Sequence, residues 1–213
     1  MGRTVTTLNM PACMCISMWQ WKAQSPGASA VRSKVTLPPG ATVEHMLMEA
    51  DDQKLLLASD AGYGFICTFN DLVARNRAGK TLISLPDNAH VMPPLVIEDE
   101  SDMLLAITAA GRMLMFPVSD LPQLSKGKGN KIISIPSAEA AAGQDGLAHL
   151  FVLPPQSTLT IHVGKRKIKL RPEELQKVTG ERGRRGSLMR GLQKIDRVEI
   201  DSPRRASAGD SEE

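Results

Sequence analysis

The stretch MLLAITAAGRMLMFPVSDLPQLSKGKGNKIISI, residues 103–135, joins two short apolar runs through a glycine turn and then enters a basic, glycine-containing turn. Two other stretches repeat this order of parts. They are LLLASDAGYGFICTFNDLVARNRAGKTLISL, residues 55–85, and TLTIHVGKRKIKLRPEELQKVTGERGRRGSLMRGL, residues 158–192. Self-similarity with a period of about 50 residues is typical of propellers and repeat arrays.

Each repeat has the same landmarks in the same order. The glycines of the first turn are Gly62, Gly111 and Gly164. An acidic residue followed by leucine comes after the second apolar run, and a glycine among cations lies seven or eight residues beyond that leucine. These later glycines are Gly79, Gly129 and Gly183. We therefore align three basic turns, RNRAGK (75–80), SKGKGNK (125–131) and GERGRRG (180–186).

The basic turns have more than one possible explanation. SKGKGNK does not match the G-x-x-x-x-G-K-[ST] pattern of a phosphate-binding loop, and a free linker would not recur in register with strands. Glycine and lysine are also common turn residues. That structural explanation accounts well for the glycines and less well for cations at one place in three repeats.

The apolar runs are short, rich in β-branched residues and bounded by glycine, proline or aspartate, as is typical of strands. The predicted strands are 55–58, 64–69, 94–97, 103–108, 112–116, 147–153, 158–163 and 166–171. Helix is predicted only at 137–142 and, as a short turn, at 172–177, which begins with Pro172. The sequence thus predicts an all-β fold of three propeller-like blades. Because propellers usually have about four to eight blades, the ring is expected to be open or incomplete.

The net charge of +3 conceals an uneven distribution. Residues 35–154 contain 8 Lys and Arg and 14 Asp and Glu, whereas residues 155–200 contain 12 and 5. A basic block beside an acidic body indicates a polyanionic partner for that block. The tail 201–213 is acidic and has no large apolar side chain, so we expect it to be disordered.

Residues 1–33 differ in composition from the rest of the chain. They contain no acidic residue, both tryptophans and two of the three cysteines. We expect this segment to be disordered or a misassigned, out-of-frame start; the alternative is a natural divergent extension. The domain itself is predicted to span 34–200, with repeats at about 50–100, 101–153 and 154–200.

Several classes of protein are disfavoured. No run of about 18 apolar residues predicts a membrane-spanning helix, and the N-terminus lacks the pattern of a secretory signal. The cysteines at 13, 15 and 67 have no disulfide-framework spacing, which fits a reducing cytosol. Cys13 and Cys15 have no matching Cys/His pair, so no metal is expected. No Ser-His-Asp or paired-carboxylate site indicates a hydrolase.

The alternation in 166–171 places Ile168 and Leu170 on one face of a strand and Lys167, Lys169 and Arg171 on the other. Side chains on one face of a strand are about 7 Å apart, so this row of cations can follow a polyanion; a solvated outer face is the alternative. The first candidates for polyanion contact are Lys165, Arg166, Lys167, Lys169, Arg171, Arg182, Arg184 and Arg185. The second group, from net acidic repeats, is Arg75, Arg77, Lys80, Lys126, Lys128 and Lys131.

Particular stretches resemble the C-terminal domain of the A-subunit of DNA topoisomerase IV, a family of type IIA topoisomerases, notably its gamma-proteobacterial members. They are DQKLLLASDAGYGF, FNDLVARNRAGK, GRMLMFPVSDLPQLSKGKGNKI, LPPQSTLTIHVGKRKIKLRPEELQKVTGERGRRG and IDRVEIDSPRRAS. The resemblance covers roughly Lys34 to Glu213. It implies a broken β-pinwheel that binds duplex DNA through cations on its outer rim.

The resemblance also implies a role in a larger enzyme. The parent would be an ATP-dependent heterotetramer that includes the B-subunit, relaxes supercoils and separates linked chromosomes in the cytoplasm, near the nucleoid. The first blades, with the basic box of the gyrase relative, have no counterpart in this sequence. The only tyrosine of this sequence, Tyr63, lies in DAGYGF. No general base or metal ligand is near it in the sequence, as a tyrosine that attacks a DNA phosphate would need. We therefore expect no strand passage and no cofactor in this chain, with Mg²⁺ and ATP bound elsewhere in the parent.

A propeller-type protein-interaction scaffold without DNA binding is the alternative function. Such a surface would use aromatic hot spots, and the chain has two Trp and one Tyr. It would also show weak dependence on salt. The salt dependence of binding therefore separates the two interpretations.

Overall fold

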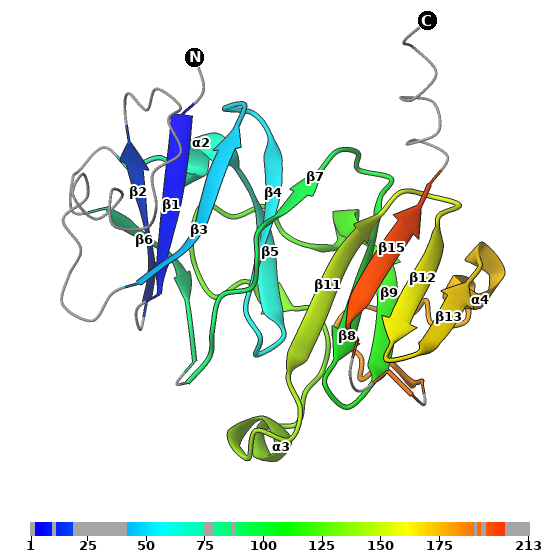
Figure 1. The fold of residues 1–213 in the computed structure, drawn as a ribbon. Helices are drawn as coiled ribbons and strands as arrows, with labels where there is room; N and C mark the ends of the chain where they lie inside the picture. Colours follow the sequence, from blue (N-terminus) through cyan, green and yellow to red (C-terminus); the bar gives the residue numbers. More distant parts are fainter. Residues whose placement is uncertain are drawn as a thin grey trace, which may run out of the picture. The chain divides into compact units, whose positions relative to one another are not determined.

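The computed structural model describes residues 3–9, 12–18, 42–74, 79–86, 88–189, 191–192 and 195–202. Within these residues the chain forms four antiparallel sheets and a few short helices (Figure 1). The predicted all-β fold is confirmed. The chain divides into two compact units, Met1–Val96 with Pro122–Asn130, and Ile97–Leu121 with Lys131–Glu213.

The first unit contains two sheets with a shared apolar core. One has the strand order β3 (Thr42–Glu49), β1 (Arg3–Asn9), β2 (Ala12–Met18) and β6 (Lys80–Ser84). The other has the order β10 (Asn130–Lys131), β5 (Tyr63–Thr68), β4 (Lys54–Ala58) and β7 (Leu95–Ile97). The core includes Leu55, Phe65, Phe69 and Leu82, all 0–1 % exposed.

The second unit also contains two sheets. The order in one is β11 (Leu147–Leu153), β8 (Met103–Thr108), β9 (Arg112–Pro117) and β14 (Ser187–Leu188). The order in the other is β13 (Arg166–Leu170), β12 (Thr158–Val163) and β15 (Arg197–Asp201). Leu105 and Ile107 of the first sheet form a buried core with Leu159 and Ile161 of the second.

The N-terminal segment adds a sheet that the repeats did not predict. Residues 1–33 were expected to be disordered or a misassigned start; β1 and β2 lie in this segment and pair with β3 and β6. Their sequences, RTVTTLN and ACMCISM, contain several β-branched residues, which favour strands. Of the tail 201–213, Asp201 ends β15, and 203–213 lie outside the described residues. That residues 1–33 are a misassigned start stays a prediction.

The acidic residue and leucine that recur in each repeat lie on short helical turns. These are α2 (Phe69–Leu72), η1 (Val118–Asp120, followed by Leu121) and α4 (Pro172–Gln176); α3 (Ser137–Ala141) lies in the predicted helix 137–142. Asp71 accepts a hydrogen bond from the backbone amide of Thr68 at 3.1 Å, which caps α2. Glu174 accepts one from the amide of Arg171 at 2.9 Å. The leucine that comes next is buried in each case.

The segments after η1 and after α4 each pair with the sheet of the preceding repeat. Ile66 of β5 donates its backbone N–H to Pro122 O at 3.0 Å and accepts from Leu124 N at 2.8 Å. In the second unit, Met115 of β9 exchanges the equivalent bonds with Val178 and Gly180, each at 2.9 Å. Each of these sheets is therefore completed by residues of the repeat that comes after it.

These pairings correct the alignment of the basic turns. Gly127 donates to Leu82 O at 2.7 Å, and Gly183 donates to the equivalent Ile132 O at 2.9 Å. Gly127 thus corresponds to Gly183, and Gly129 to Gly186. The sequence alignment of Gly129 with Gly183 is wrong because the third turn has two residues, not one, between its glycines.

Cys67 of β5 is 1 % exposed, and burial, followed by the nearby charge of Asp71, raises the pKa of its thiol from 9.0 to about 12. The thiolate is the nucleophile, so we expect no alkylation of Cys67 by iodoacetamide in the native protein at about pH 8. Mass spectrometry of the Cys67 peptide, with a denatured sample as the control, would check this. Rapid labelling of the native protein would contradict it.

Candidate nucleic-acid interface

The hairpin of β12 and β13 presents the predicted row of cations. Lys167 lies opposite His162 and Lys169 opposite Thr160 in the antiparallel pairing. Ile168 and Leu170 pack with the core of the second unit, whereas Lys167, Lys169 and Arg171 are exposed. The predicted alternation is confirmed, and β13 is an edge strand.

The outer face of this sheet differs from the faces of β8 and β9. In β8 both faces are buried, since Leu104 and Ala106 alternate with Leu105 and Ile107 and all four are 0 % exposed. In β12 and β13 one face is buried and the other is polar. A solvated outer face would also carry polar and charged side chains, and this is the structural alternative for these cations.

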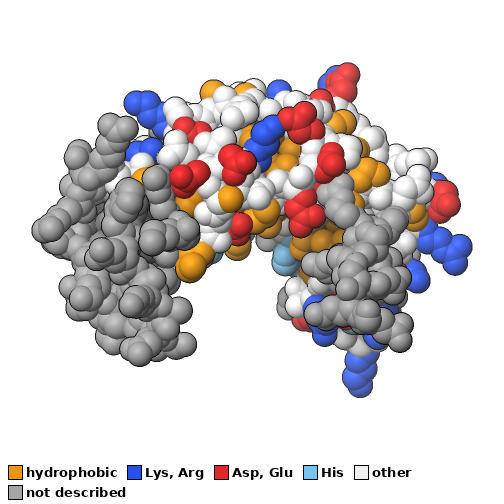
Figure 2. Space-filling view, turned by 90° about the horizontal axis from the view of Figure 1, so that it is seen from above, with side chains coloured by type: hydrophobic (Ala, Val, Ile, Leu, Met, Phe, Trp, Pro, Cys, Tyr) orange, Lys and Arg blue, Asp and Glu red, His pale blue; other side chains and the backbone are white. Residues whose placement is uncertain are grey.

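Among the described residues, the cations of the hairpin have no ion-pair partner. Lys165, Arg166, Lys167, Lys169 and Arg171 are all exposed, and none forms a salt bridge with another residue in the described ranges. In Figure 2, Lys and Arg side chains project where β13 and α4 lie, at the right of the view. This cluster of five, hereafter the strand cations, is available to an external anion.

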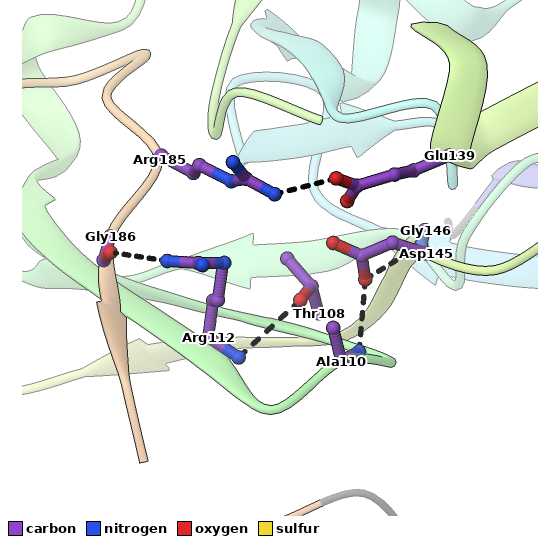
Figure 3. Close-up of polar contacts among 8 residues, drawn as sticks. All are labelled: Thr108, Ala110, Arg112, Glu139, Asp145, Gly146, Arg185 and Gly186. Carbon is purple, nitrogen blue, oxygen red and sulfur yellow. Dashed lines mark hydrogen bonds and ion pairs between the residues drawn. The ribbon is translucent and has the colours of Figure 1, made fainter. Parts of the chain in front are cut away.

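The arginines of the third basic turn are engaged within the protein. Arg182 Nη1 donates to Lys131 O at 2.8 Å. Arg184 donates from Nε and Nη2 to Glu181 Oε2 at 2.9 and 2.6 Å. Arg185 Nη2 donates to Glu139 Oε1 at 2.6 Å, and Figure 3 shows the two side chains pointing toward each other. The structure thus divides the first group of candidates into unpaired strand cations and paired turn arginines.

The second group of candidates has described members in both units. Lys126 and Lys131 are exposed, and Lys80 is half-buried in β6. Lys128 Nζ lies 4.0 Å from the ring centroid of Tyr63, a cation–π contact. Tyr63 begins β5 and has this lysine over its ring. Arg75 and Arg77 lie outside the described residues.

Arg197 is a cation on this sheet that the sequence reasoning missed. It lies opposite His162 on β15, so Lys167, His162 and Arg197 form one row across the sheet. Glu199 is close to two of them: its Oε1 is 3.2 Å from Arg197 Nη2 and its Oε2 is 3.4 Å from His162 Nε2. The alternation of 197–201 (RVEID) was the signal that could have identified this strand.

Other kinds of site find no support among the residues that the structure describes. No group of three or more His, Cys, Asp or Glu side chains there could hold a metal ion. No helix in the described ranges is long and apolar enough to cross a bilayer.

Comparison with known proteins defines the class first. Residues 53–98 and 102–153 match the family described as DNA gyrase C-terminal domain, beta-propeller. A solved structure of the gyrase A C-terminal domain superposes with a TM-score of 0.67 at 15 % identity, covering 94 % of this chain and 66 % of that one. The fold is therefore that of the gyrase-type C-terminal propellers.

Two relatives and a solved structure specify the family. The A-subunit of DNA topoisomerase 4 from Escherichia coli (strain K12) is 89 % identical over 180 residues, 84 % of this chain and 24 % of the relative. The Haemophilus influenzae (strain ATCC 51907) protein of the same name is 56 % identical over 160 residues, 75 % and 21 % of the two lengths. The structure of the E. coli ParC C-terminal domain matches with a TM-score of 0.86 and 74 % identity, over 95 % of this chain and 82 % of that one.

The chain belongs to the A-subunit family of DNA topoisomerase IV and corresponds to its C-terminal domain. It spans about a quarter of the length of the curated relatives that it matches.

Proposed function

We propose that this chain is a duplex-DNA-binding domain that works as part of a type IIA topoisomerase. The strand cations carry the proposal, because five exposed positive charges that form no salt bridge within the described part of the chain lie within seven consecutive residues, 165–171. The names of the relatives, which are DNA topoisomerase subunits, support DNA as the polyanion.

The geometry favours contact with the phosphate backbone. Lys167 and Lys169 lie on one face of β13 at an interval of about 7 Å, and Arg171, just after the strand, is exposed as well. A row of this kind can contact several phosphates of one duplex. Cations that neutralise phosphates release condensed counterions, and this release supplies affinity without reading sequence. Reading of base edges commonly uses a helix in the major groove, and the longest helices among the described residues have 5 residues.

The role of the whole enzyme extends this proposal. The domain would hold duplex DNA while a parent heterotetramer, formed with the B-subunit, relaxes supercoils and decatenates chromosomes in the cytoplasm, at the nucleoid. ATP and Mg²⁺ would be bound in other parts of that enzyme. This chain alone would bind DNA without cleaving it.

The test is the salt dependence of binding. We expect the affinity for a short fluorescent duplex, measured by anisotropy, to fall linearly on a log–log plot against salt. With about five phosphate contacts the slope should be about −4 to −5, since each contact contributes about −0.9. A folded chain that does not bind, or that binds with no dependence on salt, would overturn the proposal and favour a protein-interaction scaffold.

A further inference from the structure

Glu139 of α3 forms an ion pair with the third basic turn, 46 residues further along the chain, through Arg185. We propose that Glu139 is an affinity-determining residue: an internal competitor that occupies Arg185 and that a DNA phosphate must displace. The inference rests on the proposed function, because it concerns how many cations of the second unit are available to DNA.

The segment that carries Glu139 is held in place by hydrogen bonds of its backbone and of Asp145. The carbonyl of Glu139 accepts hydrogen bonds from the amides of Gln144 at 2.8 Å and Asp145 at 3.3 Å, which close the turn after α3. Asp145 is 6 % exposed and accepts from the amides of Ala110 at 2.9 Å and Gly146 at 3.0 Å. The turn that carries Glu139 is thereby anchored to the loop between β8 and β9 (Figure 3).

The arginine is held from the other side. Gly183 donates to Ile132 O at 2.9 Å, and Arg112 Nη1 donates to Gly186 O at 3.4 Å. These contacts fix the backbone before Arg185 to the segment at Ile132 and the backbone after it to β9. Glu139 and Arg185 therefore form their ion pair between two segments whose backbones are anchored. The positions of the two residues are fixed by these segments, so the pair does not require a flexible part of the backbone to move into place.

The pair is accessible to an external anion. The Glu139 side chain is 33 % exposed and that of Arg185 is 48 % exposed. Guanidinium binds carboxylate and phosphate with the same fork of donors, so a phosphate competes with Glu139 for Arg185 Nη2. The negative charge of Glu139 also repels a phosphate that approaches Arg185. Both effects lower the affinity of the basic turn for DNA.

The carboxylate within the third basic turn, that of Glu181, is a weaker competitor for DNA phosphate. Glu181 and Arg184 lie three residues apart, and their side chains are 77 % and 72 % exposed. Exposed ion pairs of this kind contribute little free energy because water screens them. Glu139 is the better candidate because its pair is long-range and partly shielded.

The experiment is a double-mutant cycle in the full chain. Variants Glu139→Gln, Arg185→Gln and their combination would be compared with the wild type by anisotropy with a short duplex. Glu173→Gln is the matched control, since Glu173 is an exposed glutamate of α4 with no ion pair to a described residue. At about 0.1 M salt we expect Glu139→Gln to bind about two- to fivefold more tightly than wild type, the range of a partly exposed ion pair. In the Arg185→Gln background the same change should have little effect.

The outcomes separate the inference from the proposed function. If Glu139→Gln weakens binding, Glu139 positions Arg185 for DNA and the competitor role is wrong. Equal tightening by Glu139→Gln and Glu173→Gln, or an undiminished effect with Arg185→Gln, would reduce the result to net charge. If the folded wild type does not bind duplex DNA, both the proposed function and this inference fail.

Discussion

Replacing Gly129 by alanine is expected to lower the free energy of unfolding by about 3 kcal/mol or more. Gly129 has a φ of +76°, and a Cβ placed on it would lie 2.3 Å from the carbonyl oxygen of Gly64 in β5. A left-handed conformation alone costs an alanine about 1–2 kcal/mol. The overlap adds to this cost, because the obstructing atom belongs to the backbone of a strand and moves only if the turn separates from β5.

Urea denaturation of the two proteins would measure this difference. The matched control is Gly143→Ala, because Gly143 has a φ of +65° but nothing within 4 Å of the added Cβ. Its free energy of unfolding should fall by the conformational part only, about 1–2 kcal/mol. Gly186→Ala should behave like Gly129→Ala, since its Cβ would lie 2.5 Å from Met113 O. Equal losses for Gly129→Ala and Gly143→Ala would show that the close approach to β5 has no energetic consequence.

Neutralising the exposed cations of β13 and of the residue after it should have the largest effect on DNA binding. The variant Lys167→Gln, Lys169→Gln, Arg171→Gln removes three cations that form no salt bridge within the described residues, so we expect its salt slope to become less steep by about 2.7. At about 0.1 M salt the affinity should fall by roughly a hundredfold, because fewer counterions are released. Anisotropy with the same duplex at several salt concentrations measures both quantities.

A single-charge variant controls for net charge. Lys177→Gln removes one charge from an exposed lysine that belongs to neither group of candidates, and it would be compared with Lys167→Gln. At the same salt we expect about a fivefold loss of affinity for Lys167→Gln and less than about a twofold loss for Lys177→Gln, since a screened charge away from the contact contributes little. Similar losses in both variants would mean that the overall charge attracts DNA and that β13 has no special part.

The strands were predictable where the sequence signal is local. The limits of β8, β9, β12 and β13 agree with the prediction to within a residue, because their apolar runs are bounded by turn residues. The alternation of Lys167 and Lys169 with Ile168 and Leu170 likewise identified an exposed cationic row.

The remaining features depend on partners that are distant in sequence. The two-residue strands β10 and β14 have no periodicity of their own and form because β5 and β9 offer edges for pairing. The same reason explains the misaligned glycines, since contacts with residues distant in sequence, such as those of Gly129 with Gly64 and of Gly186 with Met113, show which glycines correspond. That Arg185 is paired with Glu139 depends on the packing of α3, which no local pattern reveals.

The exchange of segments between repeats has a consequence for synthesis on the ribosome. The edge of β5 is completed by residues 122–130, and that of β9 by residues 178–188. Each of these sheets therefore keeps an open, aggregation-prone edge until part of the next repeat has emerged from the exit tunnel. A pause in translation between repeats would leave the last synthesised sheet incomplete. In the nascent chain, each of these sheets can therefore complete its folding only after the following repeat has been partly synthesised.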